Sequence, residues 1–237
     1  MSRPIGFPVP NWTPPPRPTG APMTGQYVQL EKLDAVAHVN DLFAANTVND
    51  QIWDYLPYGP FAEKAAYQKW LSEITQSDDP FFHAIKNLDT DKYEGVASYL
   101  RIDPNAGSIE VGHINYSKPL QRTRAATEAM YLLMKWAFEA GYRRYEWKCD
   151  ALNRGSRAAA QRLGLSYEGI FRQATVYKGR NRDTAWFAAI DKEWPALDNA
   201  YQTWLAPENF DDTGRQLKSL SSLTALVRVA SDPQLES

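Results

Sequence analysis

The side chains best suited to chemistry gather in one stretch of the chain, residues 108–164. Within it, the pattern predicts a strand over residues 109–116, a basic loop over 119–126 and a helix over about 127–140. The first N–H groups of a helix have no backbone partner and point outward, so a basic loop before a helix favours anion binding. This stretch therefore predicts a site for a phosphate-bearing molecule.

The same stretch continues with a second predicted strand, residues 145–150, and a short helix that Asn153 opens and that ends at Leu163. Asparagine is a preferred N-cap residue, because its side-chain oxygen accepts an N–H group of the first turn. That role accounts for Asn153 by itself. Ser156 falls in the first turn, where a serine either bonds to the local backbone or faces a bound molecule, and the sequence leaves both open.

The composition excludes several classes of function. The 237 residues carry a net charge of −2, so no general affinity for nucleic acid is expected. One cysteine, Cys149, and three histidines cannot form an internal disulfide or a Cys/His zinc site, and no metal is expected. The start of the chain lacks the apolar segment of a secretory signal, and the apolar runs are too short to cross a bilayer. We therefore expect a cytoplasmic protein that does not bind membranes.

Around this stretch, the hydrophobic periodicity predicts a mixed sheet flanked by helices. The expected strands are residues 27–33, 81–86, 95–102, 109–116, 145–150, 167–177 and 184–190. The strand–helix–strand connection in the middle implies one parallel pair, and 81–116 should form an antiparallel meander. The other expected helices are one that Asp34 caps and that runs to Ala45, residues 62–75, one that Pro195 starts, and residues 217–229.

Two segments lie outside this pattern. Residues 1–25 contain eight prolines, which exclude a helix, but their apolar side chains favour an arm that lies against its own domain or a neighbouring subunit. The tail after Asn209 is expected to be loosely held.

The order of these elements, the loop before the long helix, and the run Asn153-x-x-Ser156-x-x-x-x-x-x-Leu163-Gly164-Leu165-x-x-Glu168-Gly169 resemble the GCN5-related N-acetyltransferase (GNAT) family. Within it, they are most similar to the branch of bacterial ribosomal-protein N-terminal acetyltransferases. The resemblance covers residues 27–194. It implies an α/β (α+β) fold with a mixed, mostly antiparallel, twisted sheet flanked by helices. The expected parts are a proline-rich arm (1–25), a GNAT domain (26–194) and a helical C-terminal extension (195–237).

By this resemblance, acetyl-CoA is the co-substrate, and backbone N–H groups of the loop hold its pyrophosphate. The family's loop pattern is Gln/Arg-x-x-Gly-x-Gly/Ala, and here Arg124 replaces the first glycine. Arginine can serve there if its φ is negative and its side chain points away; otherwise the loop is a solvated basic turn. The residues expected to contact acetyl-CoA are Ile114, Asn115, Tyr116, Gln121, Arg122, Thr123, Arg124, Ala125, Ala126, Asn153 and Ser156.

The resemblance also suggests catalytic roles. Ser156 matches a proposed general acid for the CoA thiolate, whereas the proposed glutamate base of the ribosomal branch falls on Thr175, which cannot serve. Attack on a thioester needs a neutral amine, so another group must accept the proton. Glu110 is the first substitute. His113, expected on the opposite pleat face of the same strand, is the second.

The acceptor amine is expected near an aromatic loop between the first two helices, which roof the acceptor pocket in this family. The expected binding residues are Trp53, Tyr55, Tyr58, His113 and Tyr177. Core packing is the alternative for these aromatic side chains and must hold for some of them. An aromatic pocket suits a small amphipathic amine or a peptide N-terminus.

Together these expectations describe an acetyl-CoA-dependent N-acetyltransferase that moves an acetyl group to a primary amine by direct transfer in a ternary complex. CoA would lie between the strands at 109–116 and 145–150. The alternative is a catalytically silent acyl-CoA-binding regulatory module, which Arg124 and Thr175 favour. A dinucleotide-binding domain is disfavoured because the chain has no Gly-x-Gly-x-x-Gly motif. The apolar arm and the helix with Trp204 favour a homodimer.

Overall fold

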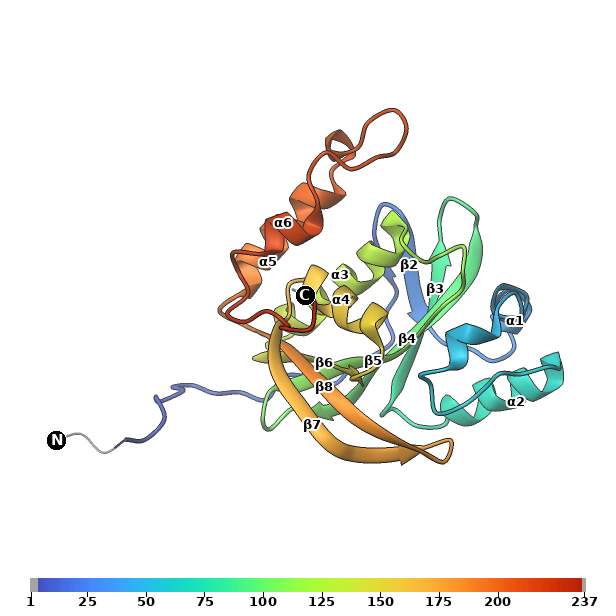
Figure 1. The fold of residues 1–237 in the computed structure, drawn as a ribbon, viewed down its shortest axis with the longest axis horizontal. Coiled ribbons are helices and arrows are strands. Elements are labelled where there is room, and N and C mark those ends of the chain that lie inside the picture. Colours follow the sequence, from blue (N-terminus) through green and yellow to red (C-terminus); the bar gives the residue numbers. More distant parts are fainter. Residues whose placement is uncertain (1–3, 236–237) are drawn as a thin grey trace.

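The computed structural model describes residues 4–235, which form an open eight-stranded sheet with helices on both faces (Figure 1). The strand order is β1-β2-β3-β4-β5-β6-β8-β7, and the β5–β6 pair is parallel while the other neighbours are antiparallel. The strands are β1 (Met23–Thr24), β2 (Val28–Lys32), β3 (Phe81–Asn87), β4 (Lys92–Asp103), β5 (Ser108–Tyr116), β6 (Arg144–Asp150), β7 (Ser166–Tyr177) and β8 (Arg180–Ile190). The predicted mixed, mostly antiparallel sheet and its meander are confirmed.

The helices divide between two hydrophobic cores, one on each face of the sheet. Successive side chains of β3 separate accordingly: Phe81 and Ile85 join one core, whereas Phe82 and Ala84 join the other. The smaller core contains α1 (Val39–Asn46), η1 (Asp50–Trp53) and α2 (Lys64–Ile74). The larger contains α3 (Arg124–Glu139), α4 (Arg154–Arg162), α5 (Trp194–Leu205) and α6 (Leu220–Thr224), with η2 (Pro207–Asn209) after α5. Within residues 4–235, no helix has the length and apolar character needed to cross a bilayer.

Helix α3 begins three residues before the predicted start. Thr123 is its N-cap, and the Thr123 hydroxyl accepts the N–H group of Ala126 at 3.0 Å. Farther along, the buried carboxylate of Glu128 accepts backbone N–H groups from Gln26, Tyr27 and Val28 at 2.8, 2.6 and 3.0 Å. The start of β2 is thereby fixed to α3, and residues 124–126 belong to the first helical turn rather than to a loop.

Strand β5 is regular only over its first half. His113 has φ of 50°, and the pairing with β4 shifts between Ser98↔Gly112 and Val96↔Asn115, which marks a bulge. The parallel pairing with β6 ends at Val111↔Trp147. Beyond that point β5 and β6 separate.

The C-terminal tail is firmly held, contrary to the expectation. Helix α6 has five residues instead of the predicted thirteen, because the chain after it turns back along α4. There, Arg157 Nε and Nη2 donate to the carboxylate of Asp232 at 2.7 and 2.6 Å, and both side chains are almost completely buried. The backbone N–H group of Tyr167 donates to the carbonyl oxygen of Ala230 at 3.1 Å.

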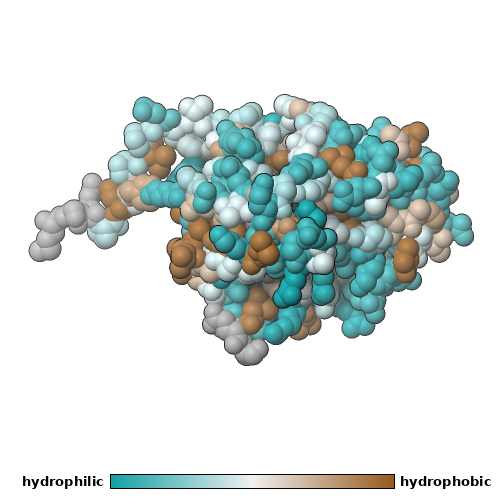
Figure 2. Space-filling view, turned by 90° about the horizontal axis from the view of Figure 1, so that it is seen from above, coloured by the Kyte–Doolittle hydropathy of each residue, from teal (hydrophilic) through white to brown (hydrophobic). Residues whose placement is uncertain are grey.

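The second half of the N-terminal arm lies against its own domain, as expected. The indole N–H of Trp12 donates to the carbonyl of Asn105, Tyr142 donates to the carbonyl of Pro16, and β1 pairs with β2. Residues 4–11 of the arm project from one end of the molecule (Figures 1 and 2). That projecting part exposes the apolar side chains of Ile5, Phe7 and Val9.

Two local predictions are wrong. Asp34 is not the N-cap of α1: its carboxylate accepts the N–H groups of Val36 and Ala37 and closes a separate turn, and the helix begins at Val39. The last hairpin turn is shorter than expected. Lys178 and Gly179 both have positive φ (48° and 70°), as a two-residue hairpin turn requires, so β8 starts at Arg180.

Candidate active site

A large cavity of about 1620 Å³ opens where β5 and β6 separate. Its wall includes adjacent residues that face opposite sides of the sheet, such as Glu110 and Val111 on β5 and Trp147 and Lys148 on β6. The cavity is therefore open to both faces of the sheet. It brings together most of the predicted site residues: Tyr55, Glu110, His113, Ile114, Tyr116, Gln121, Arg122, Thr123, Arg124, Ala126, Asn153, Ser156 and Tyr177.

The first turn of α3 forms one end of the cavity. Arg122 there has φ of 64°, whereas Arg124 is the first residue of the helix and is not among the residues with positive φ. The guanidinium of Arg124 lies 5.0 Å from the ring centre of Tyr27 and 4.3 Å from that of Phe210. Its side chain is thus stacked against Tyr27, just before β2, and against the C-terminal extension, and it leaves the backbone cradle of the helix N-terminus intact.

The start of α4 forms the neighbouring wall. Asn153 is the predicted N-cap, and its side-chain oxygen accepts the N–H of Ser156 at 3.0 Å. The hydroxyl oxygen of Ser156 accepts the indole N–H of Trp147 at 3.0 Å. Because that oxygen is the acceptor in this bond, the Ser156 proton points elsewhere, towards the sulfur of Cys149 in the cavity wall.

Cys149 lies in the cavity wall between these ends. Burial raises the pKa of its thiol to about 11, although Ser156 and Arg182 act in the opposite direction. A thiol with this pKa stays protonated near neutral pH and is a poor nucleophile. The geometry therefore matches a small core residue rather than an acetyl carrier.

The bulge in β5 directs His113 into the same cavity as Glu110, although the alternation of the strand predicts opposite faces. His113 Nδ1 lies 2.9 Å from the hydroxyl of Tyr58, and their rings stack. Burial, assisted by the positive charges of Arg101 and Arg182, lowers the pKa of His113 to about 4. The imidazole is therefore neutral near neutral pH.

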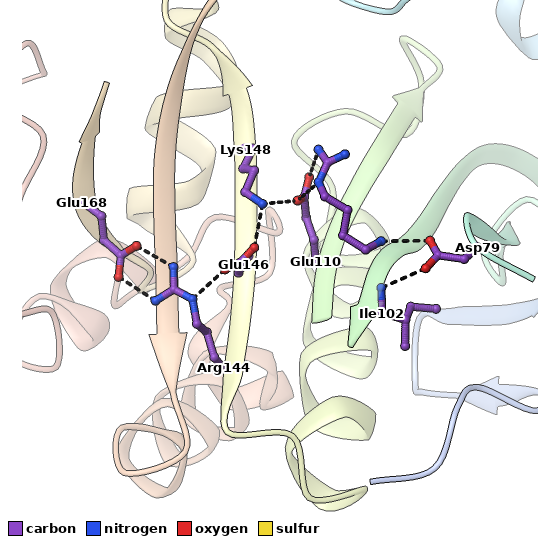
Figure 3. A network of polar contacts seen from close by, with 8 residues as sticks. Asp79, Ile102, Glu110, Arg144, Glu146, Lys148 and Glu168 are labelled. Carbon is purple, nitrogen blue, oxygen red and sulfur yellow. Dashed lines mark hydrogen bonds and ion pairs between the residues drawn. The ribbon is translucent and has the colours of Figure 1, made fainter. Parts of the chain in front are cut away.

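Glu110 belongs to a chain of ion pairs that crosses β4, β5 and β6 (Figure 3). Its buried carboxylate accepts Arg101 Nε and Nη2 at 2.8 and 3.0 Å and lies 2.8 Å from Lys148 Nζ. Lys148 also pairs with Glu146 at 2.7 Å, and Arg144 continues the chain. A carboxylate engaged by two cations is a poor candidate for a general base, so the structure does not favour the first-ranked assignment.

Aromatic side chains line the other end of the cavity. Tyr177 donates to the Asp150 carboxylate at 2.9 Å, and Tyr55 donates to a backbone carbonyl at 3.3 Å. The rings of Phe171 and Trp186 stack with centres 4.4 Å apart. This end can accommodate an apolar group beside titratable side chains.

Four predicted site residues are not in the cavity wall. Trp53 is 2% exposed and packs against Phe61 and Trp70, so the core reading is correct for it. Tyr58 reaches the site only through His113. Asn115 follows the bulge and is buried away from the cavity, and Ala125 is buried against the core.

The sequence reasoning missed three groups of cavity residues. The first group is the pair of cations Lys148 and Arg182, on β6 and β8. The second is Arg101, a cation that reaches the wall from β4. Lys148 and Arg101 belong to predicted strands, but Arg182 precedes the predicted strand 184–190 and falls within β8 only because that strand starts at Arg180. With the strand extended, alternation from Trp186, which is in the wall, places Arg182 on the same face. The extension contributes Trp204, Phe210, Gly214 and Gln216, for which no local signal exists. Within residues 4–235, no cluster of His, Cys, Asp and Glu could hold a metal ion.

Comparisons with known proteins agree with this site. The family model of the acetyltransferase (GNAT) domain matches residues 28–166. A GCN5-related N-acetyltransferase from Brucella melitensis is 48% identical over 92% of this chain and 100% of its own, with a TM-score of 0.90. A probable GNAT acetyltransferase from Chromobacterium violaceum is 41% identical over 83% of this chain and 99% of its own, with a TM-score of 0.77.

At 19% identity, the microcin self-immunity acetyltransferase MccE, solved in complex with acetyl-CoA and AMP, shares the fold alone. Its match covers 70% of this chain and 93% of that one, with a TM-score of 0.62. A comparison with curated proteins gave no match.

The α/β fold, with a cavity between two parallel strands that separate, is that of an acyltransferase. The chain belongs to the GNAT family and is an N-acetyltransferase. The family recognised from its sequence is thus confirmed.

Proposed function

We propose that this protein transfers an acetyl group from acetyl-CoA directly to a primary amine while both molecules are bound. One observation carries this proposal: the cavity reaches both faces of the sheet, with a helix N-terminus at one end and titratable side chains at the other. Two substrates can therefore enter from opposite faces and meet between β5 and β6. Direct transfer needs no covalent enzyme intermediate, which agrees with the protonated state of Cys149.

The residues of the cofactor end fit a CoA ester. The N-terminal turn of α3 offers N–H groups to a pyrophosphate, and Gln121, Arg122 and Arg124 lie around it. Asn153 and Ser156 line the path towards the strand gap. Acetyl-CoA supplies the activated acetyl thioester when it is bound.

We assign the proton transfers to Ser156 and His113. The Ser156 hydroxyl proton is not used in the bond with Trp147, and it would turn from the Cys149 sulfur to the departing thiolate. His113 is neutral near neutral pH, and its Nε2 can accept a proton from the amine, directly or through water, when Nδ1–H donates to Tyr58. Glu110 would instead fix Arg101 and Lys148 in the wall.

Calorimetric titration with acetyl-CoA and CoA, followed by thiol release against a panel of amines and peptide N-termini, tests the proposal. Binding of acetyl-CoA with thiol release on addition of one class of amine is the expected result. Binding without transfer to any amine would favour the silent regulatory module instead. Absence of acetyl-CoA binding would overturn the proposal.

A further inference from the structure

Arg182 on β8 is a cation without a counter-ion in the acceptor end of the cavity. Its guanidinium forms no hydrogen bond or ion pair with any side chain or backbone group of residues 4–235, and its Nε is buried. The guanidinium carbon lies 5.8 Å from the centre of the Tyr177 ring. Because a buried Nε–H group without an acceptor costs free energy, this position favours an acceptor that is not part of the chain.

The other charges of this wall are already engaged. Arg101 and Lys148 both pair with Glu110, and Lys148 pairs also with Glu146. Both oxygens of Asp150 accept hydrogen bonds, from the Tyr177 hydroxyl and a backbone N–H. Within the described residues, Arg182 is therefore the cation that the acceptor end of the cavity leaves for a ligand.

The location of Arg182 identifies the ligand as the acceptor rather than CoA. Alternation along β8 places Arg182 on the same face as Trp186, which pairs in register with Lys148 on β6. Arg182 acts electrostatically on His113 and Cys149, at the gap between β5 and β6. The phosphate cradle lies instead at the N-terminus of α3, on the other face.

We propose that the acceptor carries an anionic group, a carboxylate or a phosphate, in addition to its amine, and that Arg182 binds this group. A guanidinium presents two parallel N–H groups that match the oxygens of either anion. The stacked rings of Phe171 and Trp186 and the ring of Tyr177 lie beside it, so an apolar body between amine and anion also fits. This inference rests on the proposed acetyl transfer and narrows its substrate to amino-acid-like or phosphoamine acceptors.

The test compares acceptors that differ in the anionic group. L-phenylalanine is measured against L-phenylalaninamide, and O-phosphoethanolamine against ethanolamine, so that the two pairs distinguish carboxylate from phosphate. Each pair is assayed by thiol release with the wild type, Arg182→Gln, Arg182→Lys and Arg180→Gln. Arg180 is a matched control, because it is exposed on the same strand and lies outside the cavity wall.

For at least one pair, we expect Arg182→Gln to raise the KM of the anionic acceptor by about tenfold or more, and to leave the KM of its neutral partner and of acetyl-CoA unchanged. Arg182→Lys should restore part of this loss, and Arg180→Gln should have no effect. Equal effects of Arg182→Gln on anionic and neutral acceptors would overturn the inference.

A second measurement separates this inference from the proposed function. Calorimetry with 3-phenylpropionate and phenyl phosphate, which have no amine, reports anion binding without catalysis. Binding that Arg182→Gln abolishes and Arg180→Gln keeps supports the anion site, even if no amine in the panel is acetylated. Absence of anion binding in the wild type, together with acetylation of neutral amines alone, overturns the anion site and leaves the acetyltransferase proposal standing.

Discussion

The choice between Glu110 and His113 depends on one residue of backbone geometry. In a regular strand the two side chains point to opposite faces, and Glu110 is then the more suitable base. The bulge at His113 brings both into one cavity, while the pairing of Glu110 with Arg101 and Lys148 makes His113 the better candidate. What remains is a neutral imidazole beside a tyrosine hydroxyl.

If His113 accepts the amine proton, His113→Gln should lower kcat by about 10²-fold or more, with the KM for acetyl-CoA little changed. Tyr58→Phe removes the group that fixes the imidazole tautomer, so we expect a smaller fall in kcat. Thiol-release kinetics at saturating acetyl-CoA measure both. Glu110→Gln is the control: it should destabilise the fold, and a larger fall in kcat for it than for His113→Gln would restore Glu110 as the base.

His83 leads to a prediction about pH. It is 2% exposed, its Nδ1 has no partner among the described residues, and burial lowers its pKa from 6.5 to about 3. The unfolded chain thus binds a proton between these values that the folded chain does not, so stability falls as the pH drops below about 6.5. From pH 7 to pH 5 this single group should cost about 2 kcal/mol of unfolding free energy.

Urea unfolding of the wild type and His83→Gln at pH 7 and pH 5 isolates this contribution. The stability difference between the two proteins should change by the stated amount in favour of the variant at pH 5. A difference that is the same at both pH values would mean that His83 titrates normally.

At the scale of elements, α3 both contributes its N-terminus to the cavity and anchors β2 through Glu128. Its N-terminus faces the cavity, and one turn later Glu128 accepts three backbone N–H groups at the start of β2. Close packing also explains Gly25, since a Cβ there would lie 2.3 Å from the Glu128 carboxyl carbon. The phosphate end of the site is thereby fixed to the far edge of the sheet.

We expect Glu128→Ala to cost at least about 3 kcal/mol of unfolding free energy, because it leaves three N–H groups of part-buried or buried backbone without an acceptor. The melting temperature and urea midpoint measure this loss. Glu139→Ala, at the exposed end of the same helix, is the matched control and should cost less than about 0.5 kcal/mol. Equal losses in both variants would show that Glu128 contributes no more than a surface charge.

Periodicity predicted strands such as β2 and β6 because their burial alternates along the chain. Periodicity failed where one side chain can form hydrogen bonds in either of two local structures. Asp34 could cap a helix or close a turn, and both use the same acceptor chemistry. Thr123 was a readable N-cap that the loop pattern obscured. The bulge at His113 has no signature in the sequence, because it depends on the register between β5 and β4, which are paired strands.

On the scale of the whole molecule, the C-terminal extension is part of the active-site scaffold. Trp204 and Phe210 enter the cavity wall, and Phe210 stacks on Arg124 beside the phosphate cradle. The chain then returns along α4, where Asp232 pairs with Arg157. Such contacts join residues separated by 75 positions, so no local pattern could reveal them.

The Arg157–Asp232 pair provides the test of this role. Removing one partner of a buried ion pair leaves a charge uncompensated, so Asp232→Ala should cost about 3–5 kcal/mol of unfolding free energy. Because Arg157 also holds the carbonyl of Ala151 before α4, the variant should weaken acetyl-CoA binding through displacement of Asn153 and Ser156. Asp212→Ala, at an exposed position of the same extension, is the control and should change neither quantity.

A double variant, Arg157→Met with Asp232→Leu, separates charge from attachment. Replacing both ions with apolar side chains should recover much of the stability lost in Asp232→Ala, because no uncompensated charge remains. If the extension supports the site by holding α4 in place, acetyl-CoA affinity measured by calorimetry should recover together with the melting temperature. Recovery of stability without recovery of affinity would instead assign the effect to the charge of Arg157 itself, and the tail would then be a stabilising element with no influence on the cofactor end.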